Sequence, residues 1–174
     1  IKLHTWLGGP RDGPKLVFLH GFPETAITSW RHQLAHFAKL GYFVIAPDQR
    51  GYNTSSAPTE VGQYALDHLA ADIYGLVDHF YPPEQKGKGH FNLVAHDWGG
   101  AVGWHLLSHD PHDRIRKATL LNIPHPSAMT ALPFWQQIDQ LLHSYYIFFF
   151  QLPEAVVEYK LTRFDFLLVV VTHL

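Results

Sequence analysis

An aspartate stands where a short apolar segment meets a helix-forming one, and its near neighbours are small. Residues 91–95 form an apolar run typical of a buried strand. Ala95 and Gly99 lie two positions either side of Asp97. This is the spacing of the nucleophile elbow, a sharp strand-to-helix turn that lifts one side chain above a sheet. Small flanking residues are needed because the turn brings backbone close to backbone.

The acid at this turn changes the chemistry that the turn can support. A serine there needs a base before it can attack, whereas an aspartate is already an anion at neutral pH. Asp97 can therefore displace a leaving group from a saturated carbon without first losing a proton. The structural alternative is that Asp97 caps the helix that begins near Trp98.

Strand-like and helix-like segments alternate along the chain, which favours a mostly parallel sheet with helices on both faces. The expected strands are 1–7, 15–20, 42–47, 91–96 and 117–122. The expected helices are 30–40, 64–80 and 98–108. Ser29 is the expected N-cap of the first helix, and Gly41 is its expected C-terminal stop.

The composition is that of a globular chain. Of its 174 residues 47% are hydrophobic and 16% are charged, and the formal net charge is −2. This balance gives no electrostatic footprint for nucleic acid or an anionic membrane. No apolar run reaches the roughly 20 residues of a membrane span. The absence of cysteine excludes disulfides and thiolate metal sites; it leaves the compartment open, with the cytoplasm favoured.

Histidines are abundant, but their spacing does not predict a metal site. His32 and His36 are spaced i, i+4, as are His105 and His109. Neither pair carries the glutamate of an H-E-x-x-H motif or an evident third ligand. We expect solvated helix faces, no metal and no cofactor.

Two further segments are expected at the sheet edge that carries Asp97. Residues 20–23, His-Gly-Phe-Pro, close the second expected strand, and the backbone N–H groups of Phe22 and Trp98 are the expected oxyanion-hole donors. Residues 48–55 follow the third strand and are interpreted as a structural loop.

Residues 128–150 are rich in aromatics and are expected to form a helical lid that excludes water.

Together these segments resemble the α/β-hydrolase fold, and specifically its epoxide hydrolase branch. The matching strings are His20-Gly-Phe-Pro-Glu24, Asp48-Gln-Arg-Gly-Tyr52, His96-Asp-Trp-Gly-Gly100, Asn122-Ile-Pro-His-Pro126 and Ser144-Tyr-Tyr-Ile-Phe-Phe-Phe-Gln-Leu-Pro153. The resemblance covers about residues 1–165. It implies an incomplete α/β-hydrolase core over 1–126, the first part of a helical cap over 127–165 and a divergent apolar tail over 166–174.

The resemblance also implies roles for individual residues. Asp97 would be the nucleophile, and the Phe22 and Trp98 amides would form the oxyanion hole. Tyr146 matches a lid tyrosine that hydrogen-bonds the epoxide oxygen; a shift of one position would put Tyr145 in this role, and a core aromatic is the structural alternative. The implied partner is a small apolar epoxide, opened to a diol through an aspartyl ester. The oligomeric state is undetermined.

The sequence departs from this family after Asp165. The second lid tyrosine, the catalytic acid, the catalytic histidine and the last strands of the family have no match. His173 lies too close to Asp97 in sequence for the lid and further strands to fit between them. We therefore expect a C-terminally truncated chain that forms the ester but does not turn over alone. A haloalkane dehalogenase-like hydrolase and a non-catalytic product are the alternatives.

Overall fold

The computed structural model describes residues 1–82, 85, 89–110, 113–131, 133, 138 and 142. The chain divides into two compact units, Ile1–Ile123 and Pro124–Leu174. The first unit contains the sheet and its helices. In the second, the structure describes the short helix α4 (Pro126–Thr130). Most of the predicted lid helix, 128–150, lies outside the described residues.

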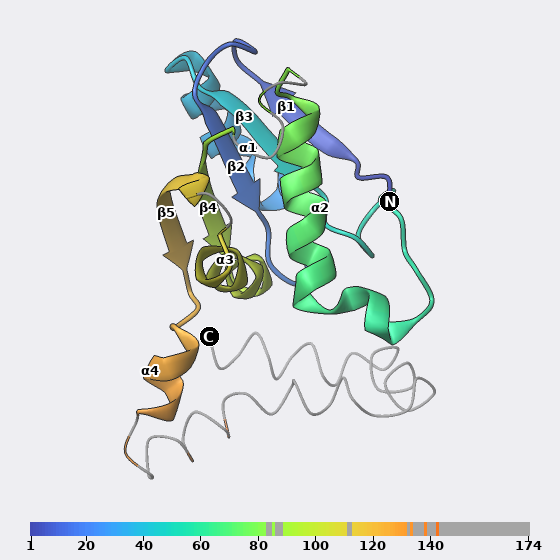
Figure 1. Ribbon diagram of the computed structural model, residues 1–174, viewed down its shortest axis with the longest axis vertical. Coiled ribbons are helices and arrows are strands. Elements are labelled where there is room, and N and C mark those ends of the chain that lie inside the picture. The colour runs from blue at the N-terminus through green and yellow to red at the C-terminus, as the bar shows by residue number, and fades with distance from the viewer. Residues whose placement is uncertain are drawn as a thin grey trace. The chain divides into compact units, whose positions relative to one another are not determined.

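The first unit is built on one twisted sheet, shown in Figure 1. Its strands are β1 (Thr5–Gly8), β2 (Lys15–Leu19), β3 (Phe43–Pro47), β4 (Phe91–His96) and β5 (Ile115–Leu121). They lie in the order β1-β3-β2-β4-β5. Only β1 is antiparallel to its neighbour; the other pairs are parallel. The predicted mostly parallel sheet is thus confirmed.

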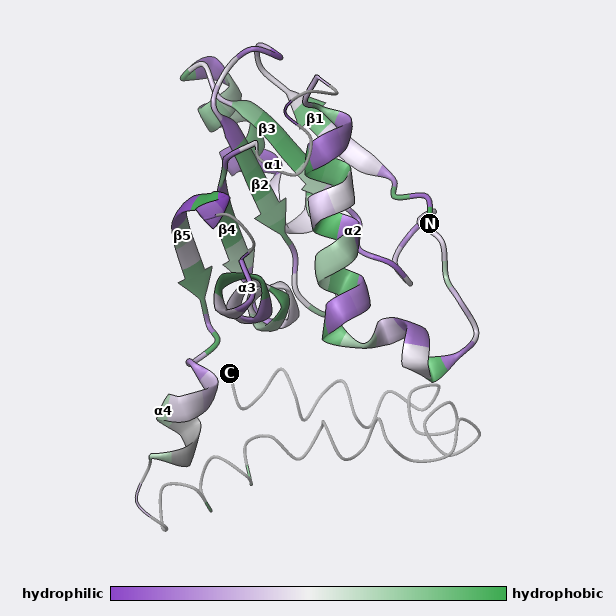
Figure 2. Cartoon of the chain, viewed as in Figure 1, coloured by the Kyte–Doolittle hydropathy of each residue, from purple (hydrophilic) through white to green (hydrophobic). Residues whose placement is uncertain are grey.

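Helices cover both faces of this sheet because its central strands are apolar on both faces. Helix α1 (Ala26–Lys39) packs on one face, and α2 (Leu66–His79) and α3 (Trp98–Ser108) pack on the other (Figure 1). In β2, Leu16 and Phe18 join the core under α1, while Val17 and Leu19 join the core under α2 and α3. Figure 2 shows this apolar band through β2, β3 and β4. None of the described helices is long and apolar enough to cross a membrane.

The prediction for the start of α1 is wrong. The helix begins at Ala26, and Thr25 is its N-cap, paired with Thr28 in a reciprocal capping box. Ser29 lies inside the helix, where its Oγ donates to Glu24 Oε2 at 2.6 Å. Thr25 precedes Ser29 and satisfies the first helical amides, so the helix gains an extra turn. Gly41 does follow the helix end, with a φ of +87°, as predicted.

Other element boundaries also shift. The first strand was predicted over 1–7, but β1 begins at Thr5. Residues before it bond to the loop after β3: Lys2 N–H donates to Ser56 Oγ and His4 N–H to Ser55 Oγ, both at 2.9 Å. A 3-10 turn, Val61–Tyr64, precedes α2 where a continuous helix from 64 was predicted. Strands β2, β3 and β4 match their predicted ranges closely.

Candidate active site

Asp97 lies on the turn between β4 and α3, at the carboxyl end of the parallel strands. Its backbone has a φ of +51° and a ψ of −119°, a conformation that residues with a Cβ rarely adopt. The turn is held because Asp97 N–H donates at 3.0 Å to the carbonyl oxygen of Leu121, the last residue of β5. Asp97 occupies the N-cap position of α3, as the structural alternative expects, but its side chain makes no capping hydrogen bond to the helix. The carboxylate is therefore available for another role.

Glycines allow two backbone segments to meet at this turn. A Cβ on Gly99 would lie 2.5 Å from His20 O and 2.7 Å from Leu19 O, both backbone atoms that cannot move aside easily. A Cβ on Gly21 would lie 2.7 Å from both Cβ and Oδ1 of Asp97. The pairing of β2 with β4, in which Leu19 faces Ala95, sets this approach. The backbone at the end of β2 therefore packs directly against the backbone of the elbow, with no room for a side chain at Gly21 or Gly99.

This close approach places one predicted oxyanion donor on the carboxylate. The Phe22 N–H donates to Asp97 Oδ1 at 2.9 Å. Within the described part of the chain, Oδ2 accepts no hydrogen bond. The other predicted donor, Trp98, is the first residue of α3, and its N–H makes no hydrogen bond to Asp97 among the described residues. The two carboxylate oxygens therefore differ in their surroundings.

The remaining predicted site residue, Tyr146, lies outside the described residues, as does its neighbour Tyr145. The histidines near the elbow helix have local partners. His105 Nε2 lies 2.8 Å from Asp67 Oδ1, and its ring stacks on that of His109 at 4.3 Å. His125 is the N-cap residue of α4, and its Nδ1 accepts a hydrogen bond from Ser127 N–H at 3.2 Å. The described residues hold no group of three side chains that could bind a metal ion.

The structure brings further residues to the elbow that the sequence did not single out. His96 Nδ1 lies 3.5 Å from Glu24 Oε2, joining the residue before Asp97 to the His-Gly-Phe-Pro-Glu segment. Burial raises the pKa of the Tyr52 hydroxyl, and the negative charge of Asp97 raises it further. Tyr52 therefore interacts electrostatically with the carboxylate. Glu24 is the last residue of the His20–Glu24 motif, and Tyr52 is the last residue of the Asp48–Tyr52 motif. Their places in these motifs are the sequence signal that could have identified them as site residues.

Buried hydrogen bonds and ion pairs of Asp48 and Arg50 hold the loop after β3, in keeping with its interpretation as a structural loop. Asp48 is fully buried; its Oδ1 accepts from Ala26 N–H at 2.7 Å, and its Oδ2 lies 2.7 Å from Asn53 Nδ2 and 2.6 Å from His4 Nδ1. Burial acts to raise the pKa of Asp48, but these hydrogen bonds outweigh it and hold the pKa below its ordinary value. Arg50 forms a two-pronged ion pair with Asp72, at 2.6 and 2.7 Å.

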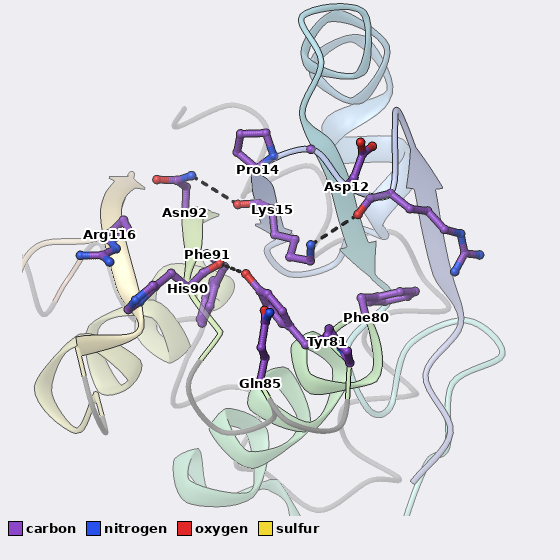
Figure 3. A pocket seen from close by; sticks show the side chains of 13 residues that line it. Asp12, Pro14, Lys15, Phe80, Tyr81, Gln85, His90, Phe91, Asn92 and Arg116 are labelled. Atoms are coloured by element: carbon purple, nitrogen blue, oxygen red, sulfur yellow. Dashed lines mark hydrogen bonds between the residues drawn. The ribbon is translucent and has the colours of Figure 1, made fainter.

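A cavity of about 550 Å³ lies elsewhere, at the opposite ends of the strands (Figure 3). Lys15 and Phe91, the first residues of β2 and β4, both line it. The Lys15 ammonium lies over the Tyr81 ring, 4.4 Å from its centre. Because Asp97 follows the last residue of β4, this cavity is not the site of the predicted chemistry.

The fold and the elbow together define the class of protein. The family profile of the alpha/beta hydrolase fold matches residues 14–168. This range is most of the chain, so the chain belongs to the α/β hydrolase fold family, as the sequence motifs predicted.

Its relatives are hydrolases of this superfamily. The chain is 44% identical over 155 residues to "AB hydrolase superfamily protein YfhM" of Bacillus subtilis (strain 168), covering 88% of this chain and 51% of that protein. It is 39% identical over 153 residues to "Epoxide hydrolase 4" of Mus musculus, covering 88% of this chain and 40% of that protein. The chain therefore spans about half, or less, of the length of these relatives.

Solved structures give the same result. Epoxide hydrolase A from Mycobacterium thermoresistibile matches with a TM-score of 0.70 and 35% identity, over 87% of this chain and 46% of that one. Epoxide hydrolase VrEH1 from Vigna radiata matches with a TM-score of 0.62 and 41% identity, over 70% of this chain and 37% of that one. The predicted resemblance to the epoxide hydrolase branch is confirmed by these neighbours.

Proposed function

We propose that this chain carries the nucleophilic half of an epoxide hydrolase site, with Asp97 as the nucleophile. The observation that carries the proposal is the unequal environment of the carboxylate. Oδ1 accepts from Phe22 N–H at 2.9 Å, whereas Oδ2 accepts no hydrogen bond among the described residues. An anion held by one oxygen presents the other to a substrate in a fixed orientation.

The proposed first step is an alkyl transfer to the enzyme. Asp97 Oδ2 attacks an epoxide carbon, the carbon–oxygen bond of the ring breaks, and the released alkoxide takes up a proton. Tyr146 is the proposed donor of that proton, on the resemblance of its motif alone. The product is an ester whose carbonyl oxygen is Oδ1.

The proposed second step would return the nucleophile to its starting state, and it needs a base to activate water, which none of the motifs matched in this chain supplies. Water would attack Asp97 Cγ and the bond from Cγ to the alkyl oxygen would break; one proton of the water would pass to that oxygen, so that a diol leaves, and the other would go to solvent, which restores the Asp97 carboxylate. Negative charge builds on Oδ1 in this step, where the amides of Phe22 and Trp98 would stabilise it. Removing one such donor typically raises the barrier by about 3–4 kcal/mol.

The substrate class rests on the relatives and the motifs. Several relatives of this chain are named epoxide hydrolases, and the aromatic character of residues 144–150 favours a small apolar epoxide. Chloroalkane substrates require the same nucleophile, so a dehalogenase-like activity is the alternative to exclude.

Intact mass spectrometry tests the proposal. The purified chain is incubated with a reactive aryl epoxide and, separately, with a primary chloroalkane. We expect one adduct of the full epoxide mass, none from the chloroalkane, and none with Asp97→Ala. Asp67→Ala, which removes an exposed carboxylate (side chain 87% exposed), is the matched control and should keep the adduct. An adduct only from the chloroalkane would favour dehalogenation, and no adduct on a folded chain would favour a non-catalytic product.

A further inference from the structure

A buried histidine lies directly behind the Phe22 amide. His20 directly follows β2, and its side chain is fully buried. Its Nε2 lies 3.0 Å from the Gln49 backbone nitrogen, which donates to it. Its Nδ1 lies 2.9 Å from the Gly21 carbonyl oxygen. The Tyr52 ring packs edge-on against the imidazole, with 4.7 Å between ring centres.

These contacts determine where the ring proton is. A backbone N–H can only donate, so the Nε2 that accepts from Gln49 carries no proton. Burial lowers the pKa of His20, which keeps the ring neutral. The single ring proton is therefore on Nδ1, and it is donated to the Gly21 carbonyl oxygen.

The Gly21 carbonyl and the Phe22 N–H belong to one peptide group. The result is a continuous hydrogen-bond chain that runs from Gln49 N–H through His20 and the Gly21–Phe22 peptide to Asp97 Oδ1. Each bond in such a chain polarises the next, because donation to a carbonyl makes the N–H of the same peptide a stronger donor. The Glu24 N–H, which also donates to Gly21 O at 3.1 Å, acts in the same direction.

Resting on the proposed function, we infer that His20 is a positioning residue that strengthens the Phe22 N–H as a donor to Asp97 Oδ1. The stronger donor affects the barriers of alkylation and of ester cleavage in opposite directions. During alkylation Oδ1 loses negative charge as it becomes an ester carbonyl, so a stronger donor does not help. During cleavage of the ester Oδ1 gains a full negative charge, so a stronger donor lowers the barrier.

The opposite effects on the rates of alkylation and ester cleavage distinguish the inferred role of His20 from a purely structural one. A residue that only maintained the fold would, when replaced, slow both steps together. Replacing His20 should slow ester cleavage while leaving alkylation unchanged or slightly faster. The ratio of the two rates is therefore the quantity to measure.

The chain is first alkylated with the aryl epoxide, and the ester is then cleaved with hydroxylamine. The hydroxylamine nitrogen bonds to Asp97 Cγ, the bond to the alkyl oxygen breaks, and the alcohol leaves with the proton released from nitrogen. This step builds the same charge on Oδ1 as attack by water and needs no catalytic base from the protein. Intact mass follows both rates.

The variants differ in whether they keep the donor. His20→Leu removes the ring N–H, and we expect cleavage to slow by about three- to tenfold, less than the 10²–10³-fold typical when an oxyanion donor is deleted outright. His20→Asn can place its amide N–H near the Nδ1 position, so it should restore most of the rate. Val17→Ala, a buried change in the adjoining strand β2, should lower stability without changing the ratio. Equal slowing of both steps in His20→Leu would overturn the inference.

A measurement on the unaltered chain tests the inference without any chemistry. Imidazole ¹⁵N shifts should show the Nδ1–H form for the histidine whose ring gives nuclear Overhauser contacts to Tyr52. The Nε2–H form would overturn the inference even if a His20 variant fails to fold. If the Nδ1–H form is found but no adduct forms, the proposed function is what has failed, and the role of His20 in it fails as a consequence.

Discussion

Gly21 leaves no room for a side chain beside the reactive carboxylate. A Cβ on Gly21 would approach both Cβ and Oδ1 of Asp97 to 2.7 Å, closer than such atoms are found in proteins. Either the carboxylate or the Phe22 segment must then move. Because the Phe22 N–H and Asp97 Oδ1 are joined by one 2.9 Å hydrogen bond, a small displacement breaks it.

Gly21→Ala should therefore impair the chemistry more than the fold. We expect adduct formation with an aryl epoxide to slow by at least about tenfold, since misplacement of a reacting group by 1 Å can cost about a hundredfold. Gly75→Ala is the control: it lies in α2 with open space around its would-be Cβ and should raise helix stability by about 0.5–1 kcal/mol. An unchanged alkylation rate in Gly21→Ala would mean that the Phe22 contact does not orient Asp97.

At the scale of elements, sequence reasoning succeeded where the signal is local. The β4–α3 turn was predicted from the small residues around Asp97, and its bounds match the structure. The start of α1 was missed because Ser29 and Thr25 are both good caps, and only the reciprocal bonds with Thr28 distinguish them. The contacts of Asp97 with Gly21, Phe22 and Tyr52 depend on the β2–β4 and β2–β3 pairings, which no local pattern encodes.

The corrected cap gives a prediction for α1. Thr25→Ala removes the side-chain acceptor for Thr28 N–H and should lower the free energy of unfolding by about 1 kcal/mol. Ser29→Ala removes only a bond to the half-buried Glu24 side chain and should cost less. Chemical denaturation of the two variants compares the costs. A larger loss in Ser29→Ala would contradict the observed start of the helix.

At the scale of the whole molecule, two buried groups tie the first unit together and make its stability depend on pH. His20 joins the end of β2 to the loop after β3, and Asp48 joins that loop to His4 and to the start of α1. Burial lowers the pKa of His20 below its ordinary value of 6.5. The hydrogen bonds of Asp48 outweigh its burial and hold its pKa below 3.8.

Both shifts predict a loss of stability in acid. Below pH 6.5 the unfolded chain binds a proton at His20 that the folded chain does not bind. The free energy of unfolding therefore decreases as the pH is lowered from 6.5 towards the pKa of His20 in the folded state. The contribution of Asp48 is complete above pH 3.8 and is lost as pH falls through its lower folded pKa. Denaturation midpoints between pH 8 and 4, compared with those of His20→Asn, test the first part. Identical slopes for the two proteins would show that His20 does not titrate on unfolding.

The claim that Asp97 is the nucleophile is tested by locating the adduct on the chain. The chain is alkylated with an aryl epoxide, treated with hydroxylamine, digested and analysed by tandem mass spectrometry. The claim predicts that the added group, and after cleavage the hydroxamate, is found at Asp97 and at no other carboxylate. A group carried by a different residue, or an adduct that persists in Asp97→Ala, would contradict it.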